Sequence, residues 1–351
     1  MASLVLKAGP AALASIREHG MQSALFTHVA AAAGGPKWLA LKPLDRVLFG
    51  DWLREPAQPL IGIGSSIGAW RLAALAQCDP IQTLDRFEAA YLAQAYTEKP
   101  TAREVADEAG RILDVFVDAQ AQQEILASQR IQLNVVTTKV QGLLARHSAV
   151  LQMLGLIKII AANSLSRQCF ARYVQRILFH VPGAAAAYAD DGFVTHTVEL
   201  NQSNLRAALL GTAAIPLVIA AVRDIPGGPS GTYMDGGLID YHMDLPIAKP
   251  KGLTLLPHFS ERVTTGWFDR YFKGRLPQHL DHTLLLAPSE ELLARLPNGK
   301  VPDRNDFAHY GSDNAARIRD WKRAIAECGR LADDWQSWLA DGSLVERIQP
   351  I

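Results

Sequence analysis

One short stretch, "LIGIGSSIGAW" at residues 60–70, constrains the fold of this chain more than any other. Its apolar start is typical of a buried strand, and the apolar residues after Ser66 recur at helical spacing, so the stretch predicts a strand, a tight turn and a helix. Gly64 and Gly68 flank Ser66, and the absence of a Cβ at both positions leaves room for neighbouring backbone. The stretch therefore predicts an α/β fold in which a turn lifts the Ser66 hydroxyl clear of the end of a strand.

The rest of the chain repeats this alternation of strands and helices. Helices are predicted at residues 10–19 and within residues 83–127. Strands are predicted within residues 24–33, 59–64, 130–140, 193–200, 231–240, 252–259 and 282–288. This alternation predicts a three-layer α/β/α fold with a mostly parallel central sheet. Ligands bind such sheets at the carboxyl ends of the strands, which is where Ser66 would lie.

The sequence does not mark a clear domain boundary, because it contains no internal repeat, low-complexity tract or long linker. We expect one α/β domain over residues 1–288 and a helical C-terminal extension over residues 289–351 that packs on the same domain. The tryptophans of the extension are expected to be packing anchors, namely Trp321, Trp335 and Trp338. The segment "VPDRNDF" at 301–307 has the composition of a polar turn, and no chemistry is expected of it.

Composition and charge exclude several classes of protein. Of the 351 residues, 49% are hydrophobic and 20% are charged, which is typical of a folded globular chain. The 35 basic and 35 acidic residues balance, so no global field attracts nucleic acid, and none is expected as a partner. The three cysteines have no metal-ligand spacing and predict reduced, mostly buried thiols. Because the N-terminus also lacks a signal-peptide pattern, we expect a cytoplasmic location.

The most apolar run lies at residues 149–162 and includes Lys158. It is shorter than the ~20 residues that a helix needs to cross a bilayer. The favoured interpretation is a buried core helix, and the alternative is a surface element that touches lipid or forms the wall or lid of an acyl site.

Three interpretations of the turn at Ser66 compete: a phosphate-binding turn, a nucleophile elbow and plain packing. A dinucleotide-binding turn needs GxGxxG, whereas Gly62, Gly64 and Gly68 give GxGxxxG, and no Gly-Lys-Ser/Thr follows as a P-loop requires. The pattern GxSxG at residues 64–68 is that of a nucleophile elbow, and the predicted strand and helix on either side suit it. The pattern therefore favours Ser66 as a nucleophile, which then needs a base and an oxyanion site.

Two other glycine-containing turns offer these groups. At Gly34 and Gly35 a predicted strand turns into a helix, so their backbone N–H groups can point into a cleft with the positive end of a helix dipole behind them. Asp235 ends a predicted strand just before two further glycines. A carboxylate beside Ser66 could take its proton directly if the site is dry enough to raise the basicity of that carboxylate. Each turn, taken alone, is also compatible with an ordinary loop.

Taken together, "AGGPK", "GSSIGA" and "DGGLID" resemble, in their order, the motifs of the patatin-like phospholipase family. The segment "GTAAIPLVIAAV" is similar to the family's segment before its aspartate, and the motif-bearing core spans about residues 27–248. The resemblance implies that Ser66 is the nucleophile and Asp235 its base, a dyad without histidine. It also implies that Gly34 and Gly35 supply oxyanion N–H groups, and that Lys37 steadies their loop.

The implied reaction is hydrolysis of an acyl lipid or another carboxylic ester. The acyl group passes to Ser66, and water then attacks the acyl-enzyme while Asp235 moves the protons. We expect neither a metal nor a cofactor, and we expect at most transient peripheral contact with a membrane; the sequence carries no signal for an oligomeric state. Two positions depart from the family pattern: Ala33 replaces a glycine and is expected to narrow the oxyanion loop, and Trp38 replaces another and is expected to fill acyl-binding space.

The sequence leaves two alternatives open. The chain order Ser66, Asp235, His258 also suits a Ser-Asp-His esterase. A lipid-binding protein without catalysis is the second alternative, since a fold does not fix a function. A metal site at Asp240, His242 and Asp244 is less favoured, because their alternation suits a loop better.

Overall fold

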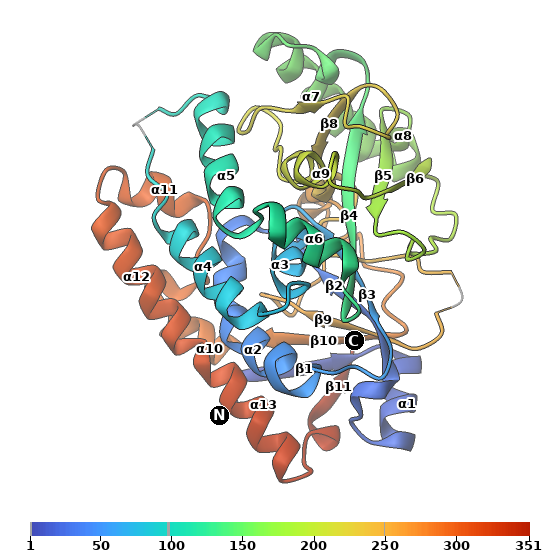
Figure 1. The fold of residues 1–351 in the computed structure, drawn as a ribbon, viewed down its shortest axis with the longest axis vertical. Helices are drawn as coiled ribbons and strands as arrows, with labels where there is room; N and C mark the ends of the chain where they lie inside the picture. Colours follow the sequence, from blue (N-terminus) through green and yellow to red (C-terminus); the bar gives the residue numbers. More distant parts are fainter. Residues whose placement is uncertain (1, 97–98, 249) are drawn as a thin grey trace.

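The computed structural model describes residues 2–96, 99–248 and 250–351. Within these ranges the strands form one large, mostly parallel sheet with helices packed around it (Figure 1). The predicted three-layer α/β/α fold is therefore confirmed.

The sheet follows the order β11-β1-β10-β9-β2-β3-β4-β5-β6, with β8 pairing to β4 and β7 to β8. The run from β10 through β9, β2 and β3 to β4 is parallel, whereas β1 pairs antiparallel with β10 and β5 pairs antiparallel with β4. The strand bounds are β1 (Leu4–Ala8), β2 (Phe26–Ala31), β3 (Leu60–Ser65), β4 (Ile131–Val140), β5 (Val174–His180), β6 (Thr195–Glu199), β7 (Val222–Arg223), β8 (Thr232–Asp235), β9 (Leu253–Pro257), β10 (Thr283–Pro288) and β11 (Ile348–Pro350).

Side-chain caps define where several helices begin. Asp79, Thr101, Asp118 and Asp313 each accept a hydrogen bond from a backbone N–H in the first turn of the helix that follows. The helix bounds are α1 (Pro10–His19), α2 (Lys42–Val47), α3 (Ile67–Leu75), α4 (Pro80–Leu92), α5 (Ala102–Phe116), α6 (Ala119–Ala127), α7 (Ala149–Leu165), α8 (Arg167–Ala171), α9 (Leu205–Thr212), α10 (Glu290–Arg295), α11 (Asn305–Tyr310), α12 (Asn314–Glu327) and α13 (Gly329–Ala340). Two short 3₁₀ segments, η2 (Gly35–Ala40) and η6 (Trp267–Tyr271), lie near the site described below.

The long strand β4 brings the ends of β3 and β8 together. Its first part pairs in parallel with β3, with Ser65 opposite Val136, and its second part pairs antiparallel with β8, with Asp235 opposite Thr137. Because Val136 and Thr137 are consecutive, β3 and β8 point their final residues at each other. This topology places Ser66, the residue after β3, beside Asp235, which lies 169 positions further along the chain.

The C-terminal extension packs against the part of the molecule that carries the glycine turn at residues 34–35. Helices α12 and α13 run along one side of the molecule, where α12 contacts η2 and α13 contacts α2 (Figure 1). The three tryptophans expected to be packing anchors are buried. The extension also ends in β11, which pairs in parallel with β1 at the edge of the sheet and was not expected from the helical sequence before it.

The expectation of a buried core helix at residues 149–162 is wrong. Helix α7 lies at one end of the molecule, opposite α13 (Figure 1). Its buried positions, Gly155, Ile159 and Asn163, form a narrow stripe at helical spacing. The apolar side chains outside the stripe are exposed, among them Val150, Met153, Leu154, Ile157 and Leu165. Among the described residues, no helix combines the length and the hydrophobicity that crossing a membrane requires.

The cysteines also differ in part from expectation. All three carry free thiols, but only Cys328 is buried, whereas Cys169 is partly exposed and Cys78 is exposed. The expectation of mostly buried thiols is therefore wrong for Cys78, which lies in the bend between α3 and α4.

Candidate active site

The turn at Ser66 has the backbone of a nucleophile elbow. Ser66 directly precedes α3, and its backbone has φ 53° and ψ −132°, a conformation that residues other than glycine rarely adopt. A Cβ on Gly64 would lie 2.6 Å from the amide nitrogen of Ala69, and one on Gly68 would lie 2.0 Å from the carbonyl oxygen of Ala31. Both glycines are therefore required, because neighbouring backbone occupies the space of a side chain.

The Ser66 hydroxyl is bonded directly to a carboxylate. Its Oγ donates to Oδ2 of Asp235 at 2.7 Å, and the other carboxylate oxygen accepts the Gly237 N–H, also at 2.7 Å. Asp235 is buried, and this burial raises its pKa above the ordinary aspartate range, although the hydrogen bond from Ser66 opposes the shift. A carboxylate with a raised pKa is a stronger base towards the hydroxyl that it faces.

The two adjacent serines have different partners. The Ser66 N–H donates to Oγ1 of Thr212 at 2.8 Å, and that hydroxyl donates to the carbonyl oxygen of Val136 on β4. Ser65 points the other way, and its hydroxyl donates to the carbonyl oxygen of Asp240 at 2.7 Å. Only Ser66 therefore lies at the Asp235 carboxylate. Thr212, which belongs to the segment "GTAAIPLVIAAV" but was given no role from the sequence, holds the elbow in place.

Backbone N–H groups without protein partners lie near the elbow. Gly35 begins η2 with φ 57°, and Gly34 caps it. Within the described ranges, no protein acceptor binds the N–H of Gly34, of Gly35 or of Ile67. The sequence prediction did not include Ile67, although in a nucleophile elbow the residue directly after the serine is a usual source of an oxyanion N–H.

Lys37 extends from the same glycine turn. Its ammonium group lies 4.5 Å from the centre of the Phe259 ring, and none of the described carboxylates forms an ion pair with it. Burial lowers the pKa of Lys37. The negative charge of Asp303 opposes this shift, whereas the positive charges of Arg270 and Arg304 add to it. The Phe259 ring also packs against Gly34, where a Cβ would lie 2.7 Å from ring atom Cε1. Lys37 and Gly34 thus share one aromatic support.

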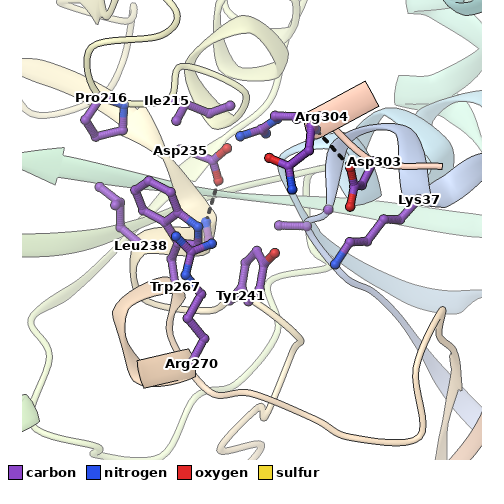
Figure 2. Close-up of a pocket in the computed structure, with 14 residues that line it drawn as sticks. Lys37, Ile215, Pro216, Asp235, Leu238, Tyr241, Trp267, Arg270, Asp303 and Arg304 are labelled. Atoms are coloured by element: carbon purple, nitrogen blue, oxygen red, sulfur yellow. Dashed lines mark hydrogen bonds between the residues drawn. The ribbon is translucent and has the colours of Figure 1, made fainter. Parts of the chain in front are cut away.

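Two cavities open at this site. The first, of about 260 Å³ and here called the polar cavity, contains Asp235 and Lys37 (Figure 2). The second, of about 220 Å³ and here called the apolar cavity, contains Ser66. Other residues that line the polar cavity are Ala33, Gly34, Ile215, Pro216, Gly237, Leu238, Tyr241, Trp267, Arg270, Asp303, Arg304 and Asn305. Others that line the apolar cavity are Gly35, Ile67, Trp70, Tyr91, Gln94, Tyr96, Pro100, Val105, Ala109, Ile112, Ala213, Val218, Ile219, Arg304 and Phe307.

Ala33 and Trp38, the two positions that depart from the family pattern, differ in whether they line a cavity. Trp38 is buried, stacks on Phe87 with ring centres 4.1 Å apart, and lines neither cavity. Ala33 lines the polar cavity, and its N–H donates to the carbonyl oxygen of Tyr241 at 2.9 Å. The polar turn at residues 301–307 contributes Arg304 to both cavities, so it lies at the site rather than apart from it.

The structure does not bring His258 to Ser66. The His258 ring packs on His242 and Phe259, bonds through Nδ1 to the backbone of Ser260, and lines neither cavity. Burial lowers the pKa of His258 to about 3.

The acidic residues near His242 hold protein groups. Asp240 binds the guanidinium of Arg176 through both oxygens, at 2.7 and 3.0 Å. Asp244 accepts the backbone N–H groups of Gln278 and His279. Each carboxylate therefore has a structural role in its own loop.

An α/β/α fold with a serine on a strand–helix elbow, hydrogen-bonded to a buried carboxylate beside unpartnered N–H groups, is typical of serine acyl hydrolases. The chain belongs to the patatin-like phospholipase family, whose model matches residues 52–243, more than half of its length. Membership implies lipid acyl hydrolase activity in general. No curated protein and no solved structure matches the chain. The matched region contains Ser66 and Asp235, whereas the turn at Gly34 precedes it and Arg304 follows it.

Proposed function

We propose that this protein hydrolyses carboxylic esters of acyl lipids with Ser66 as nucleophile and Asp235 as general base. The observation that carries the proposal is the 2.7 Å hydrogen bond from the Ser66 hydroxyl to a buried carboxylate whose pKa is raised. Asp235 accepts the hydroxyl proton as Oγ attacks the ester carbonyl carbon, and the N–H groups of Gly34 and Gly35 stabilise the oxyanion. The N–H of Ile67 is a third candidate donor.

Collapse of this intermediate breaks the bond to the alcohol, which leaves with the proton held by Asp235. Water then attacks the acyl-enzyme and gives a proton to Asp235. The second collapse releases the carboxylic acid and returns that proton to Ser66. The apolar cavity, lined by Trp70, Ile112 and Phe307 among others, supports the binding of the acyl chain next to Ser66.

The exposed apolar side of α7 supports a further part of this proposal, transient docking on an anionic lipid bilayer. Helix α7 is hydrogen-bonded to η6, which contributes Trp267 and Arg270 to the polar cavity. The Asn163 side chain donates to the Asp269 carboxylate at 2.9 Å. Tyr271, the last residue of η6, and Leu276, which follows it in the chain, are also exposed. Two exposed cations belong to the same two segments: Lys158 lies in α7, and Lys273 lies between Tyr271 and Leu276. Apolar side chains next to cations suit the boundary between acyl chains and anionic headgroups.

Labelling with a fluorophosphonate probe tests the nucleophile. Wild type and Ser65→Ala are expected to label, and Ser66→Ala is expected not to, which makes the adjacent serine a matched control. Asp235→Asn is expected to slow labelling by about 10²–10⁴-fold, the usual contribution of a general base. His258→Gln is expected to label normally.

Two results would contradict the proposal. Loss of labelling in His258→Gln, with its fold intact by circular dichroism, would identify a Ser-Asp-His esterase instead. Absence of labelling in wild type, together with binding to lipid vesicles, would identify a lipid-binding protein without catalysis.

A further inference from the structure

Three cations and two carboxylates extend into the polar cavity. Lys37, Arg270 and Arg304 reach it from three separate segments of the chain (Figure 2). Within the part of the chain that the structure describes, none of the three forms an ion pair with a carboxylate, and the guanidinium of Arg270 instead donates to the hydroxyl of Tyr271 at 2.6 Å. Like charges that share a cavity repel one another, so this arrangement favours an anionic occupant.

The two carboxylates at the cavity do not balance these cations. Asp303 forms an ion pair with Lys300 at 2.7 Å, and Lys300 is not part of the cavity lining. Asp235 accepts hydrogen bonds from Ser66 and Gly237, and its negative charge also attracts Arg304, so one carboxylate faces three cations. The cavity therefore keeps an excess of positive charge beside the nucleophile.

Arg304 has a special place among the three cations, because it lines both cavities. Its guanidinium lies against the glycine turn, where a Cβ on Gly35 would be 3.0 Å from Nε of Arg304. An ester carbonyl held between Ser66 and Gly35 would thus have the Arg304 guanidinium as an immediate neighbour. Arg304 comes from the C-terminal extension, outside the region that the family model matches.

We propose that Arg304, together with Lys37 and Arg270, binds an anionic group, a phosphate or carboxylate, on the alcohol part of the ester substrate. The inference rests on the proposed function: with the acyl chain in the apolar cavity, the alcohol part extends from Ser66 into the polar cavity. A guanidinium binds such oxyanions through paired, charge-assisted hydrogen bonds. Arg304 is accordingly a specificity-determining residue that favours anionic esters over neutral ones.

Two substrates with the same acyl chain and the same ester test this, namely 1-acyl-glycerol-3-phosphate and the corresponding 1-monoacylglycerol. Wild type is expected to show a higher kcat/KM for the phosphate-bearing ester. Arg304→Gln is expected to lower the ratio of the two kcat/KM values by about 10- to 100-fold, the usual effect of losing a hydrogen bond to a charged group. The loss is expected mainly in KM, and Arg304→Lys is expected to restore part of the ratio.

Arg323→Gln is the matched control, because it removes the same charge from an exposed position of the same extension. It is expected to leave the ratio unchanged. An equal loss on both substrates in Arg304→Gln, or an unchanged ratio, would overturn the proposal.

Inhibition by inorganic phosphate distinguishes a site that binds the headgroup of a substrate from a site that binds a free anion. Competitive inhibition by phosphate that Arg304→Gln abolishes, combined with equal turnover of the two esters, would mean that the cavity binds a free anion and would also overturn the proposal. Failure of the proposed function itself is distinguishable, because the protein would then hydrolyse neither ester.

Discussion

The Arg71 guanidinium binds the Asp45 carboxylate through two hydrogen bonds, 2.5 Å from Nε to Oδ2 and 2.6 Å from Nη2 to Oδ1. Arg71 lies in α3, directly after the elbow, and Asp45 lies in α2, which follows the glycine turn. Both side chains are buried. The pair therefore fixes Ser66 relative to Gly34 and Gly35.

Removal of one member of this pair is expected to destabilise the protein strongly. Asp45→Leu or Arg71→Met leaves a buried charged group without its partner, and the free energy of unfolding is expected to fall by about 3–5 kcal/mol. The double variant Asp45→Leu/Arg71→Met is expected to recover a large part of this loss, because neither charge remains buried. Urea unfolding measures all three, and strictly additive losses would disprove the coupling.

The elbow glycine Gly68 is expected not to tolerate alanine. Its Cβ would lie 2.0 Å from the Ala31 carbonyl oxygen, so backbone has to move, and the free energy of unfolding is expected to fall by about 3 kcal/mol or more. Gly329→Ala is the control, since a Cβ there meets nothing within 4 Å and the residue begins α13. We expect this control to be neutral or to stabilise the protein by about 0.5–1 kcal/mol. Equal melting temperatures for the two variants would contradict the packing argument.

The Asp235 carboxyl predicts opposite pH dependences for activity and stability. Activity needs the carboxylate, so kcat/KM is expected to fall as pH decreases through the pKa of Asp235, which burial places above the ordinary aspartate value. The effect on stability has the opposite sign, because a raised pKa means that the fold favours the protonated carboxyl. The stability that protonated Asp235 contributes is complete below about pH 4, the pKa of an aspartate in the unfolded chain. It is lost as pH rises through the pKa of Asp235 in the folded protein.

Asp235→Asn separates these two effects. The variant is expected to lose about 10²–10⁴-fold in kcat while its melting temperature at neutral pH equals or exceeds that of wild type, because no charge is then buried. The stability difference is expected to shrink towards pH 4. A variant that is less stable than wild type at pH 8 and equally stable at pH 4 would show that the carboxylate stabilises the fold instead.

Sequence patterns identified what is local at the site. The elbow at Ser66 and the turn at Asp235 are encoded by glycines whose Cβ atoms would meet backbone, such as Gly236, where the distance to the Val136 carbonyl oxygen would be 2.1 Å. That Ser66 and Asp235 meet depends on β4 pairing with both β3 and β8, which no local pattern encodes.

Other features were missed for the same kind of reason. Arg304 lies in a turn with ordinary polar composition, and only the packing of the C-terminal extension against the glycine turn brings it to the site. Helix α7 was misjudged because hydrophobicity alone does not distinguish a core helix from one whose apolar side faces outward. Its buried stripe of Gly155, Ile159 and Asn163 is narrower than its apolar surface.

The exposed side of α7 predicts binding to anionic vesicles. Ile157 is 56% exposed, and full burial of such a side chain contributes about 1.5–3 kcal/mol, so Ile157→Ser is expected to weaken binding to vesicles of phosphatidylcholine and phosphatidylglycerol by about 10-fold. Ile351→Ser is a matched control. Ile351 is also exposed, at 48%, and directly follows β11, an edge strand that lies far from α7 in Figure 1. Sedimentation with vesicles measures the partition coefficient, and the melting temperatures of both variants are expected to stay near that of wild type, since neither side chain is buried. Lower affinity on uncharged phosphatidylcholine vesicles is expected for wild type, because the cations Lys158 and Lys273 then lose their counter-charge. Equal weakening by both isoleucine variants would show that α7 is not the docking face.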